Sequence, residues 1–362
     1  MIYFDNAATT QPVIAAPKIF YNPSSPHGLG ITAERVLREA RKTISTALNC
    51  AAEEIIFTSG GTESNNIAIL GFALVHMKTK AELYAVPHEH PSILAPMQSA
   101  AERGWANINT NYNNLLTCTH QGRTLVSISH VNHETGDIND INSIATTIKK
   151  NNPQAIIHID GMQGFCKESA NLNNIDIYTF SGHKCHGPAG IGGLWVKKGV
   201  RLVPLMYGGG QESGHRPGTE NVTGIVQMAE AVKQLQSQLT INHQRVTQVK
   251  NIIANLTNKL PETYINAITT NTSPYILNMS FVGIKGEVLV HSLSGKGVHV
   301  SMGAACHSKK RTKPALEIMG FPPAIAESAI RFSFSPFNTE EEAASARNII
   351  AEEVTRLRKI MR

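Results

Sequence analysis

Short runs of β-branched and aromatic residues alternate with segments of helical period through the first two-thirds of this 362-residue chain. Five runs have the composition of buried strands, at 55–58, 83–86, 125–128, 155–159 and 175–180. The first run is followed from about Glu63 by apolar residues at 67, 70, 71, 74 and 75, which is the spacing of one helix face. This alternation predicts an α/β fold with a mostly parallel sheet, helices on both of its faces, and ligands at the carboxyl ends of the strands.

The pattern changes near residue 225. Residues 225–260 predict a long polar helix, 277–282 a strand, the region near 286–293 a helix, and the chain from Glu340 a terminal helix. We therefore expect a large α/β domain over 12–240 and a smaller α+β domain built from 1–11 and 241–362.

Composition narrows the class of protein. Hydrophobic residues make up 41% and charged residues 17%, as in an ordinary globular protein. The net charge of +6 is mildly basic, but Lys and Arg form no dense stripe interleaved with aromatic residues, which does not favour direct nucleic-acid binding. The longest apolar run, 67–75, is too short to span a bilayer, and the N-terminus lacks the pattern of a signal peptide.

The cysteines indicate a reducing compartment. Five are scattered along the chain without CxxC spacing, at Cys50, Cys118, Cys166, Cys185 and Cys306. Such spacing argues against a disulfide framework and against a zinc site, so we expect no metal and a cytoplasmic protein.

Three motifs at predicted strand ends carry chemistry when taken together. Thr58-Ser59-Gly60-Gly61-Thr62-Glu63 leads from a strand into a helix, where free N–H groups and the helix dipole stabilise an anion. Asp160 ends one predicted strand and, if buried, needs a cationic partner. Lys184 follows the next strand in a crowded stretch, Phe180 to Gly190, where a desolvated amine can act as a nucleophile toward an aldehyde.

Each motif alone has a plainer interpretation. Thr62 would be a helix N-cap, and Asp160 a capping carboxylate. Together, however, the three supply a phosphate site, a partner for a pyridinium nitrogen and a Schiff-base amine. These are the requirements of pyridoxal phosphate.

At this point the chain resembles the NifS/IscS-type cysteine desulfurases and the related selenocysteine lyases, which are fold-type I pyridoxal-phosphate enzymes. The resemblance runs nearly end to end, through YFDNAATT at 3–10, NPSSPHGLG at 22–30, IIFTSGGTESNN at 55–66, EHPSIL at 89–94, HVNHETGDI at 130–138, SGHKCHGPAGIGGLWV at 181–196, GGGQESGHRPGTENV at 208–222, MGAACHS at 302–308 and AIRFSFS at 329–335.

The resemblance implies a role for each matching residue. Lys184 would hold the cofactor as a Schiff base and move the substrate α-proton, Asp160 would pair with the ring nitrogen, His90 would stack on the ring, and Gln163 would bind the ring hydroxyl. Arg331 would bind the substrate carboxylate as a bidentate pair. Asn132 would contact both cofactor and substrate. The phosphate would be bound by Gly61, Thr62, Ser181 and His183 of one subunit and by Thr219 of its neighbour.

Cys306 is the implied sulfur carrier, on a mobile loop at about 301–313. Small residues precede it and the basic run Lys309-Lys310-Arg311 follows it, which favours thiolate over thiol. In the family this cysteine takes the substrate sulfur as a persulfide while alanine is released, and the sulfur then passes to an acceptor protein. The resemblance also implies a homodimer, since Thr219 completes the neighbour's phosphate site.

Other interpretations stay open at this stage. A selenocysteine lyase would use the same residues, and an aminotransferase or β-lyase would not need Cys306. A non-catalytic subunit of a nucleic-acid modification complex would suit the basic charge, although Lys184, Asp160 and Arg331 are all present. The chain departs from the family pattern at His133, Gly161, Met162 and Ala189, and it ends soon after its last predicted helix. The sequence does not identify the acceptor.

Overall fold

Residues 1–17, 21–111, 114, 116–117, 123–302 and 314–361 are described by a computed structural model of the chain. They form two compact units. The larger unit comprises Gln11–His130 and Asn139–Ser237, and the smaller comprises Met1–Thr10, Val131–Ile138 and the chain from Gln238 onward.

The segment Val131–Ile138 belongs to the smaller unit, although the sequence analysis assigned it to the large domain. Val131 pairs with Ile138 across a short turn and packs in an apolar cluster with Ala7 and Ile276. Asp137 accepts hydrogen bonds from the backbone of Ile268 and Thr269. These long-range contacts decide which unit the segment joins, and no local pattern reports them.

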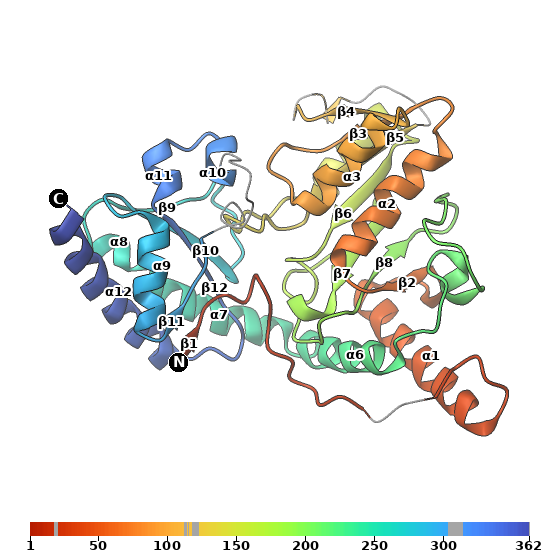
Figure 1. Cartoon of the computed structure of the whole chain (residues 1–362), viewed down its shortest axis with the longest axis horizontal. Coiled ribbons are helices and arrows are strands. Elements are labelled where there is room, and N and C mark those ends of the chain that lie inside the picture. Colours follow the sequence, from red (N-terminus) through yellow and green to blue (C-terminus); the bar gives the residue numbers. More distant parts are fainter. Residues whose placement is uncertain (18–20, 112–113, 115, 118–122, 303–313, 362) are drawn as a thin grey trace. The chain divides into compact units, whose positions relative to one another are not determined.

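A seven-stranded sheet forms the centre of the larger unit, in the order β2-β8-β7-β6-β5-β3-β4 (Figure 1). Its strands are β2 (Ile55–Thr58), β3 (Ala81–Tyr84), β4 (Ala106–Asn109), β5 (Thr124–Ser129), β6 (Ile156–Asp160), β7 (Ile177–Ser181) and β8 (Gly192–Val196). Neighbours from β7 to β4 are parallel, and β8 is antiparallel to both β7 and β2. The predicted α/β class and mostly parallel sheet are confirmed.

Strand β8 was missed by the sequence analysis because two glycines open it. A Cβ at Gly192 would lie 2.7 Å from the Gly60 Cα, and one at Gly193 would lie 2.8 Å from the Ile56 carbonyl oxygen. Glycine is therefore needed where β8 meets β2, and it removes the β-branched pattern by which a strand is recognised.

Helices cover both faces of this sheet. Leu125 packs in a cluster with α2 (Gly61–Val75) and α3 (Pro91–Glu102), whereas the next residue, Val126, packs in another cluster with α1 (Gly28–Leu48), α5 (Ile141–Asn151) and α6 (Val222–Gln236). Successive strand residues thus point to opposite buried faces, as expected of a doubly covered sheet. Short 3₁₀ turns are η1 (Ala52–Glu54), η2 (Gly182–Lys184) and η3 (Gln211–Gly214).

The predicted long helix over 225–260 is wrong, because three helices occupy this stretch. They are α6, α7 (Leu239–Ala254) and α8 (Leu256–Lys259). Val232 and Leu235 of α6 belong to the core of the larger unit, whereas Val246 and Ile253 of α7 belong to the core of the smaller one. The apolar residues of this stretch keep their helical spacing, but they belong to two separate cores. The helix is therefore interrupted between α6 and α7, where one unit ends and the other begins.

The smaller unit contains a three-stranded antiparallel sheet in the order β12-β10-β9 and a parallel pair, β1 with β11. Its remaining elements are β1 (Ile2–Tyr3), β9 (Thr263–Ile265), β10 (Ile276–Phe281), α9 (Gly286–Gly295), β11 (Val298–His299), α10 (Ala315–Ile318), α11 (Pro323–Glu327), β12 (Ala329–Ser333) and α12 (Glu340–Met361). The predicted strand near 277–282 and the predicted helices near 286–293 and from Glu340 are present.

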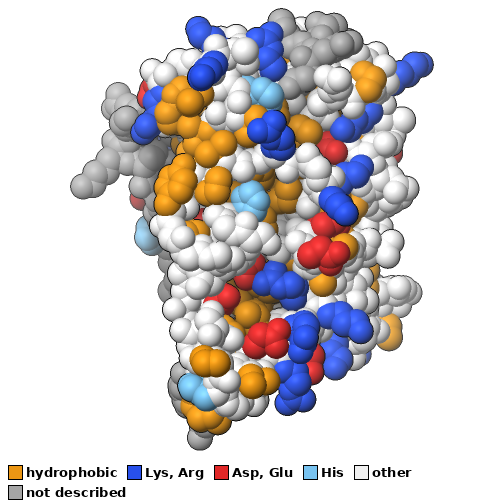
Figure 2. Space-filling view, turned by 90° about the vertical axis from the view of Figure 1, so that its right-hand side faces the viewer, with side chains coloured by type: hydrophobic (Ala, Val, Ile, Leu, Met, Phe, Trp, Pro, Cys, Tyr) orange, Lys and Arg blue, Asp and Glu red, His pale blue; other side chains and the backbone are white. Residues whose placement is uncertain are grey.

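The surface has a mixed charge. On the face drawn in Figure 2, basic side chains are dispersed, and in its lower part they lie among acidic ones. None of the helices in the described part of the chain combines the length and the apolar character that crossing a bilayer requires.

Tyr178 on β7 explains one departure from the family pattern. A Cβ at Gly161 would lie 2.2 Å from the Tyr178 ring, and one at Gly164 would lie 2.2 Å from the His130 imidazole. Tyr178 is fully buried and its hydroxyl is 3.1 Å from His130 Nδ1. The ring of Tyr178 therefore fills the space that an alanine side chain at 161 would occupy.

We expect Gly161→Ala to lower the free energy of unfolding by roughly 1 to 3 kcal/mol, because the added methyl group displaces a buried ring. Gly28→Ala, at the start of α1, is the matched control, since no heavy atom lies within 4 Å of its Cβ position. Chemical denaturation followed by tryptophan fluorescence checks both variants. Equal midpoints would contradict the assignment of this packing constraint.

Candidate active site

Asp160 is a buried carboxylate at the end of β6, with 5% of its surface exposed. Asn65 Nδ2 donates to one of its oxygens at 3.0 Å, and the Met162 N–H donates to the other at 3.0 Å. Both donors are neutral, and no Lys, Arg or His in the described part of the chain pairs with this carboxylate. The described residues therefore do not supply the cation that burial of Asp160 requires.

A second polar site lies between the start of α2 and the end of β7. The N-cap of α2 is Gly60, at φ 152°, so the interpretation of Thr62 as N-cap is wrong and Thr62 sits inside the first turn. The Ser181 hydroxyl is buried and has no hydrogen-bond partner among the described residues. It lies 3.7 Å from the Cβ position of Gly60, so this hydroxyl and the free N–H groups of the helix adjoin. Such a donor set suits an anion.

Lys184 and His183 lie in the turn η2, directly after β7, and both are half-buried. Burial and the nearby cations Lys184 and Lys167 lower the pKa of His183 to about 4, so its imidazole is neutral at pH 7. The next residue, Cys185, packs in the core, where its thiol hydrogen-bonds to that of Cys166.

Gln163 is held by a buried lysine. Lys167 Nζ donates to Gln163 Oε1 at 3.0 Å. Since an amide oxygen accepts and an amide nitrogen donates, this bond leaves Gln163 Nε2 as the group that can donate to a ligand.

His90 is the N-cap of α3 and follows β3. Its Nδ1 accepts from the Ser92 N–H at 3.1 Å and lies 2.8 Å from Ser92 Oγ. The preceding residue, Glu89, has 5% of its surface exposed and accepts from the Ser129 N–H at 2.9 Å. Its other oxygen is buried without a partner among the described residues. Burial and the charge of Asp160 raise the pKa of Glu89 to about 8.

Two predicted site residues belong to the smaller unit. Arg331 is buried on β12, donates to the His133 carbonyl at 2.9 Å, and lies 3.4 Å from Asp5 and 3.9 Å from Glu134. Asn132 uses its side-chain oxygen to accept from the N–H groups of Glu134 and Thr135.

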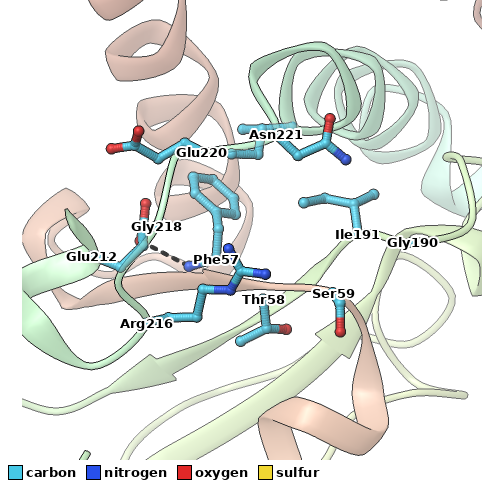
Figure 3. A pocket seen from close by; sticks show the side chains of 11 residues that line it. Phe57, Thr58, Ser59, Gly190, Ile191, Glu212, Arg216, Gly218, Glu220 and Asn221 are labelled. Atoms are coloured by element: carbon cyan, nitrogen blue, oxygen red, sulfur yellow. Dashed lines mark hydrogen bonds between the residues drawn. The ribbon is translucent and has the colours of Figure 1, made fainter. Parts of the chain in front are cut away.

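Two further predicted site residues are Thr219 and Cys306. Thr219 is exposed on the loop that follows η3, and Cys306 lies outside the described residues. A small pocket of about 30 Å³ beside Thr219 is lined by Thr58, Ser59, Arg216 and Gly218, among others. Figure 3 shows Thr58 and Ser59 on one side of this pocket and Glu220 and Asn221 on the other.

No group of acidic, His or Cys side chains in the described ranges has the arrangement of a metal site.

Four residues that support the site were given no role from the sequence. They are Asn65, Glu89, Ser92 and Lys167. Asn65 carried a signal, since it is a polar side chain next to the apolar stripe of α2. The other three gave none, because their roles depend on contacts with residues distant in sequence.

Three comparisons with known proteins identify the family. Residues 2–345 match the family described as aminotransferase class-V. A "NifS/IcsS protein homolog" of Lactobacillus delbrueckii subsp. bulgaricus is 37% identical over 95% of this chain and 94% of that protein. A "Cysteine desulfurase IscS" of Buchnera aphidicola is 36% identical over 99% of this chain and 94% of that protein.

A solved structure described as "NIFS-LIKE PROTEIN" superposes with a TM-score of 0.89 at 32% identity, over 98% of this chain and 99% of that one. The chain therefore belongs to the class-V aminotransferase family, and within it this enzyme is a pyridoxal-phosphate-dependent cysteine desulfurase of the NifS/IscS type.

Proposed function

We propose that this enzyme removes the sulfur of L-cysteine as a persulfide on Cys306, releases L-alanine, and delivers the sulfur to an acceptor protein. The observation that carries the proposal is the buried Asp160 carboxylate, which has two neutral donors and no cationic partner among the described residues. A ligand with a protonated ring nitrogen supplies the missing charge.

The residues present fit pyridoxal phosphate. Its phosphate matches the unpaired Ser181 hydroxyl and the first turn of α2, with Gly61 and Thr62. His183 is a neutral donor beside it. When bound, the cofactor supplies an aldehyde that condenses with amines and a protonated pyridine ring that withdraws electrons.

The side chains of the larger unit divide the remaining tasks. Lys184 Nζ would bind the aldehyde covalently and would hold the α-proton of the substrate. Asp160 keeps the ring nitrogen protonated because a buried carboxylate favours a neighbouring cation. Gln163, oriented by Lys167, donates its Nε2 to the ring oxygen. His90 stacks on the ring.

Arg331 and Asn132 recognise the substrate from the smaller unit. The Arg331 guanidinium faces Asp5 and Glu134, and its Nε is buried without a partner among the described residues. A substrate carboxylate binds by competing with these two acidic side chains. The backbone of Arg331 pairs with Ser301, and Cys306 follows Ser301 by five residues in the sequence.

Transfer of sulfur from the substrate to Cys306 conserves atoms and electrons. The Cys306 thiolate attacks the sulfur of the substrate and forms an S–S bond, while the bond between that sulfur and the substrate Cβ breaks. The electron pair of the broken bond passes to the substrate carbon skeleton, which takes up a proton at Cβ and leaves as alanine.

Thr219 and two buried cysteines bear on the assembly of the enzyme and on its compartment. Thr219 is exposed, so it is available to complete the phosphate site of a second copy of the chain, which favours a homodimer. Cys166 and Cys185 are free thiols although they hydrogen-bond to each other, which suits the reducing cytoplasm.

Cys306→Ala is expected to abolish alanine release from L-cysteine while the visible absorption of the bound cofactor is retained. Labelled cysteine should place the persulfide on Cys306 in the native enzyme, as read by mass spectrometry of the alkylated protein. Cys50→Ala is the control, since this half-buried thiol should not carry the label.

Full alanine release by Cys306→Ala would favour a β-lyase instead. If Cys306→Ala loses turnover of cysteine but retains turnover of selenocysteine, the role of Cys306 in sulfur transfer stands. A native enzyme that turns over selenocysteine alone would make it a selenocysteine lyase.

Lys184→Ala is expected to lose covalent attachment of the cofactor and all turnover, because no other amine takes its role. Borohydride reduction followed by peptide mapping should label Lys184 in the native enzyme. Lys197→Ala, after β8, serves as the control for removal of one lysine. A reduced label on a different residue would contradict the assignment.

Glu89 gives the enzyme a stability that depends on pH. Its pKa is about 8 in the folded protein, whereas an ordinary glutamate has 4.5, so the folded state holds one more proton between these values. Stability contributed by this group therefore falls as the pH rises from about 4.5 to 8, and it levels off above 8.

Glu89→Gln is expected to remove this dependence. Relative to the native protein, the variant should gain on the order of 5 kcal/mol in the free energy of unfolding at high pH, and little at pH 5. Urea denaturation of the cofactor-free protein at both pH values checks this. Glu102→Gln, at the exposed end of α3, reports the effect of removing a surface carboxylate. An equal gain at both pH values would show that Glu89 does not titrate in this range.

A further inference from the structure

A buried amide, Asn65, joins the two sides of the cofactor site. Its surface is 0% exposed, and its side chain makes three hydrogen bonds to three other elements of the larger unit. Nδ2 donates to Asp160 Oδ2 at 3.0 Å and to Ser92 Oγ at 2.8 Å, and Oδ1 accepts from Thr179 Oγ1 at 2.8 Å. Figure 1 shows the elements involved, α2, α3, β6 and β7.

Chemistry fixes the orientation of this amide. A carboxylate only accepts hydrogen bonds, so the nitrogen of Asn65 must face Asp160. Both of its N–H hydrogens are then used, one for Asp160 and one for Ser92. Thr179 has a single hydroxyl hydrogen, which the amide oxygen of Asn65 takes. The amide is thus held on all sides.

The same logic fixes the tautomer of His90. The Ser92 N–H points at His90 Nδ1, and a backbone N–H cannot accept. Nδ1 is therefore the unprotonated nitrogen, and the proton of the neutral ring lies on Nε2. Since Ser92 Oγ accepts from Asn65, the hydroxyl hydrogen of Ser92 is directed at Nδ1, 2.8 Å away.

We propose that Asn65 is a positioning residue that couples Asp160, the partner of the ring nitrogen, to His90, the residue that stacks on the ring, through Ser92. One side chain fixes the plane of the carboxylate and, through a hydroxyl group, the protonation of the imidazole. This inference rests on the proposed roles of Asp160 and His90.

The titratable groups around this network are neutral at pH 7. Burial lowers the pKa of His158, which contacts Thr179 and Ser127, to about 3. The pKa values of Glu89 and Tyr178 are raised by burial and in part by the charge of Asp160. The amide of Asn65 is one of the two hydrogen-bond donors to the Asp160 carboxylate in the described part of the chain.

Asn65→Leu keeps the number and branching of the side-chain heavy atoms and removes all three hydrogen bonds. We expect the dissociation constant for pyridoxal phosphate to rise on the order of 10- to 100-fold, since a hydrogen bond to a buried charge is lost. Asn107→Leu is the matched control, because this amide also donates to a carboxylate, that of Glu82, but at the surface. Equilibrium dialysis of the full chain with the cofactor measures both.

Asn65→Asp separates positioning from mere structural support. When ionised, the new carboxylate opposes Asp160, and when protonated it donates to Asp160 as the amide did. Relative to the native enzyme at the same pH, cofactor binding by Asn65→Asp should therefore be weak at pH 8 and approach native strength at pH 6. A residue that only fills space would give the same deficit at both pH values.

Ser92→Ala tests the second arm of the network. It should raise the pKa of His90, because a donor to Nδ1 is lost. Nitrogen-15 NMR of the histidine-labelled, cofactor-free protein reads this titration and the tautomer, with His90→Gln for assignment.

Native cofactor affinity in both Asn65 variants, or a protonated Nδ1 on neutral His90 in the native protein, would overturn the coupling alone. A native chain that binds no pyridoxal phosphate would overturn the proposed function instead. If Asn65→Leu does not fold by circular dichroism, Asn65→Asp at two pH values still decides the outcome.

Discussion

A buried carboxylate with no cationic partner among the described residues is the constraint around which the larger unit is organised. Asp160 ends a central strand of the sheet, where parallel strands place their ligands, and its neighbours supply one amide and one backbone N–H. A lysine or arginine beside Asp160 would stabilise the cofactor-free protein. It would also neutralise the carboxylate that, in the proposed function, pairs with the protonated ring of the cofactor. In the proposed function, the protonated ring of the cofactor offsets the electrostatic cost of burying this carboxylate.

The polar residues around Asp160 form an ordered network rather than a set of separate contacts. Asn65 touches Asp160, Ser92 and Thr179, and Ser92 continues to His90. Each of the two hydrogens on Asn65 Nδ2 has its own acceptor, so the direction of these hydrogen bonds follows from the groups at their ends. A buried network of this kind holds side chains in one geometry, because any misplaced member leaves a polar group unsatisfied.

Two units divide the chemistry between them. The larger holds the residues assigned to the cofactor, whereas the smaller holds Arg331, whose backbone pairs with Ser301 shortly before the segment that carries Cys306. In the proposed function, substrate recognition by Arg331 and sulfur capture by Cys306 are both tasks of the C-terminal part of the chain. The guanidinium of Arg331 is prepared for an anion by Asp5 and Glu134, which hold it in place.

The sequence by itself determined the α/β class, five of the seven strands of the central sheet, and the order of the motifs at strand ends, because hydrophobic period and Gly-rich turns are local signals. It also identified the family, through residues that match in order along the whole chain. Tertiary structure alone decided the glycine-led strand β8, the break within 225–260, the membership of Val131–Ile138 and the partners of Asp160. Each of these depends on which distant side chain fills a neighbouring space or satisfies a buried polar atom, and no local pattern records that.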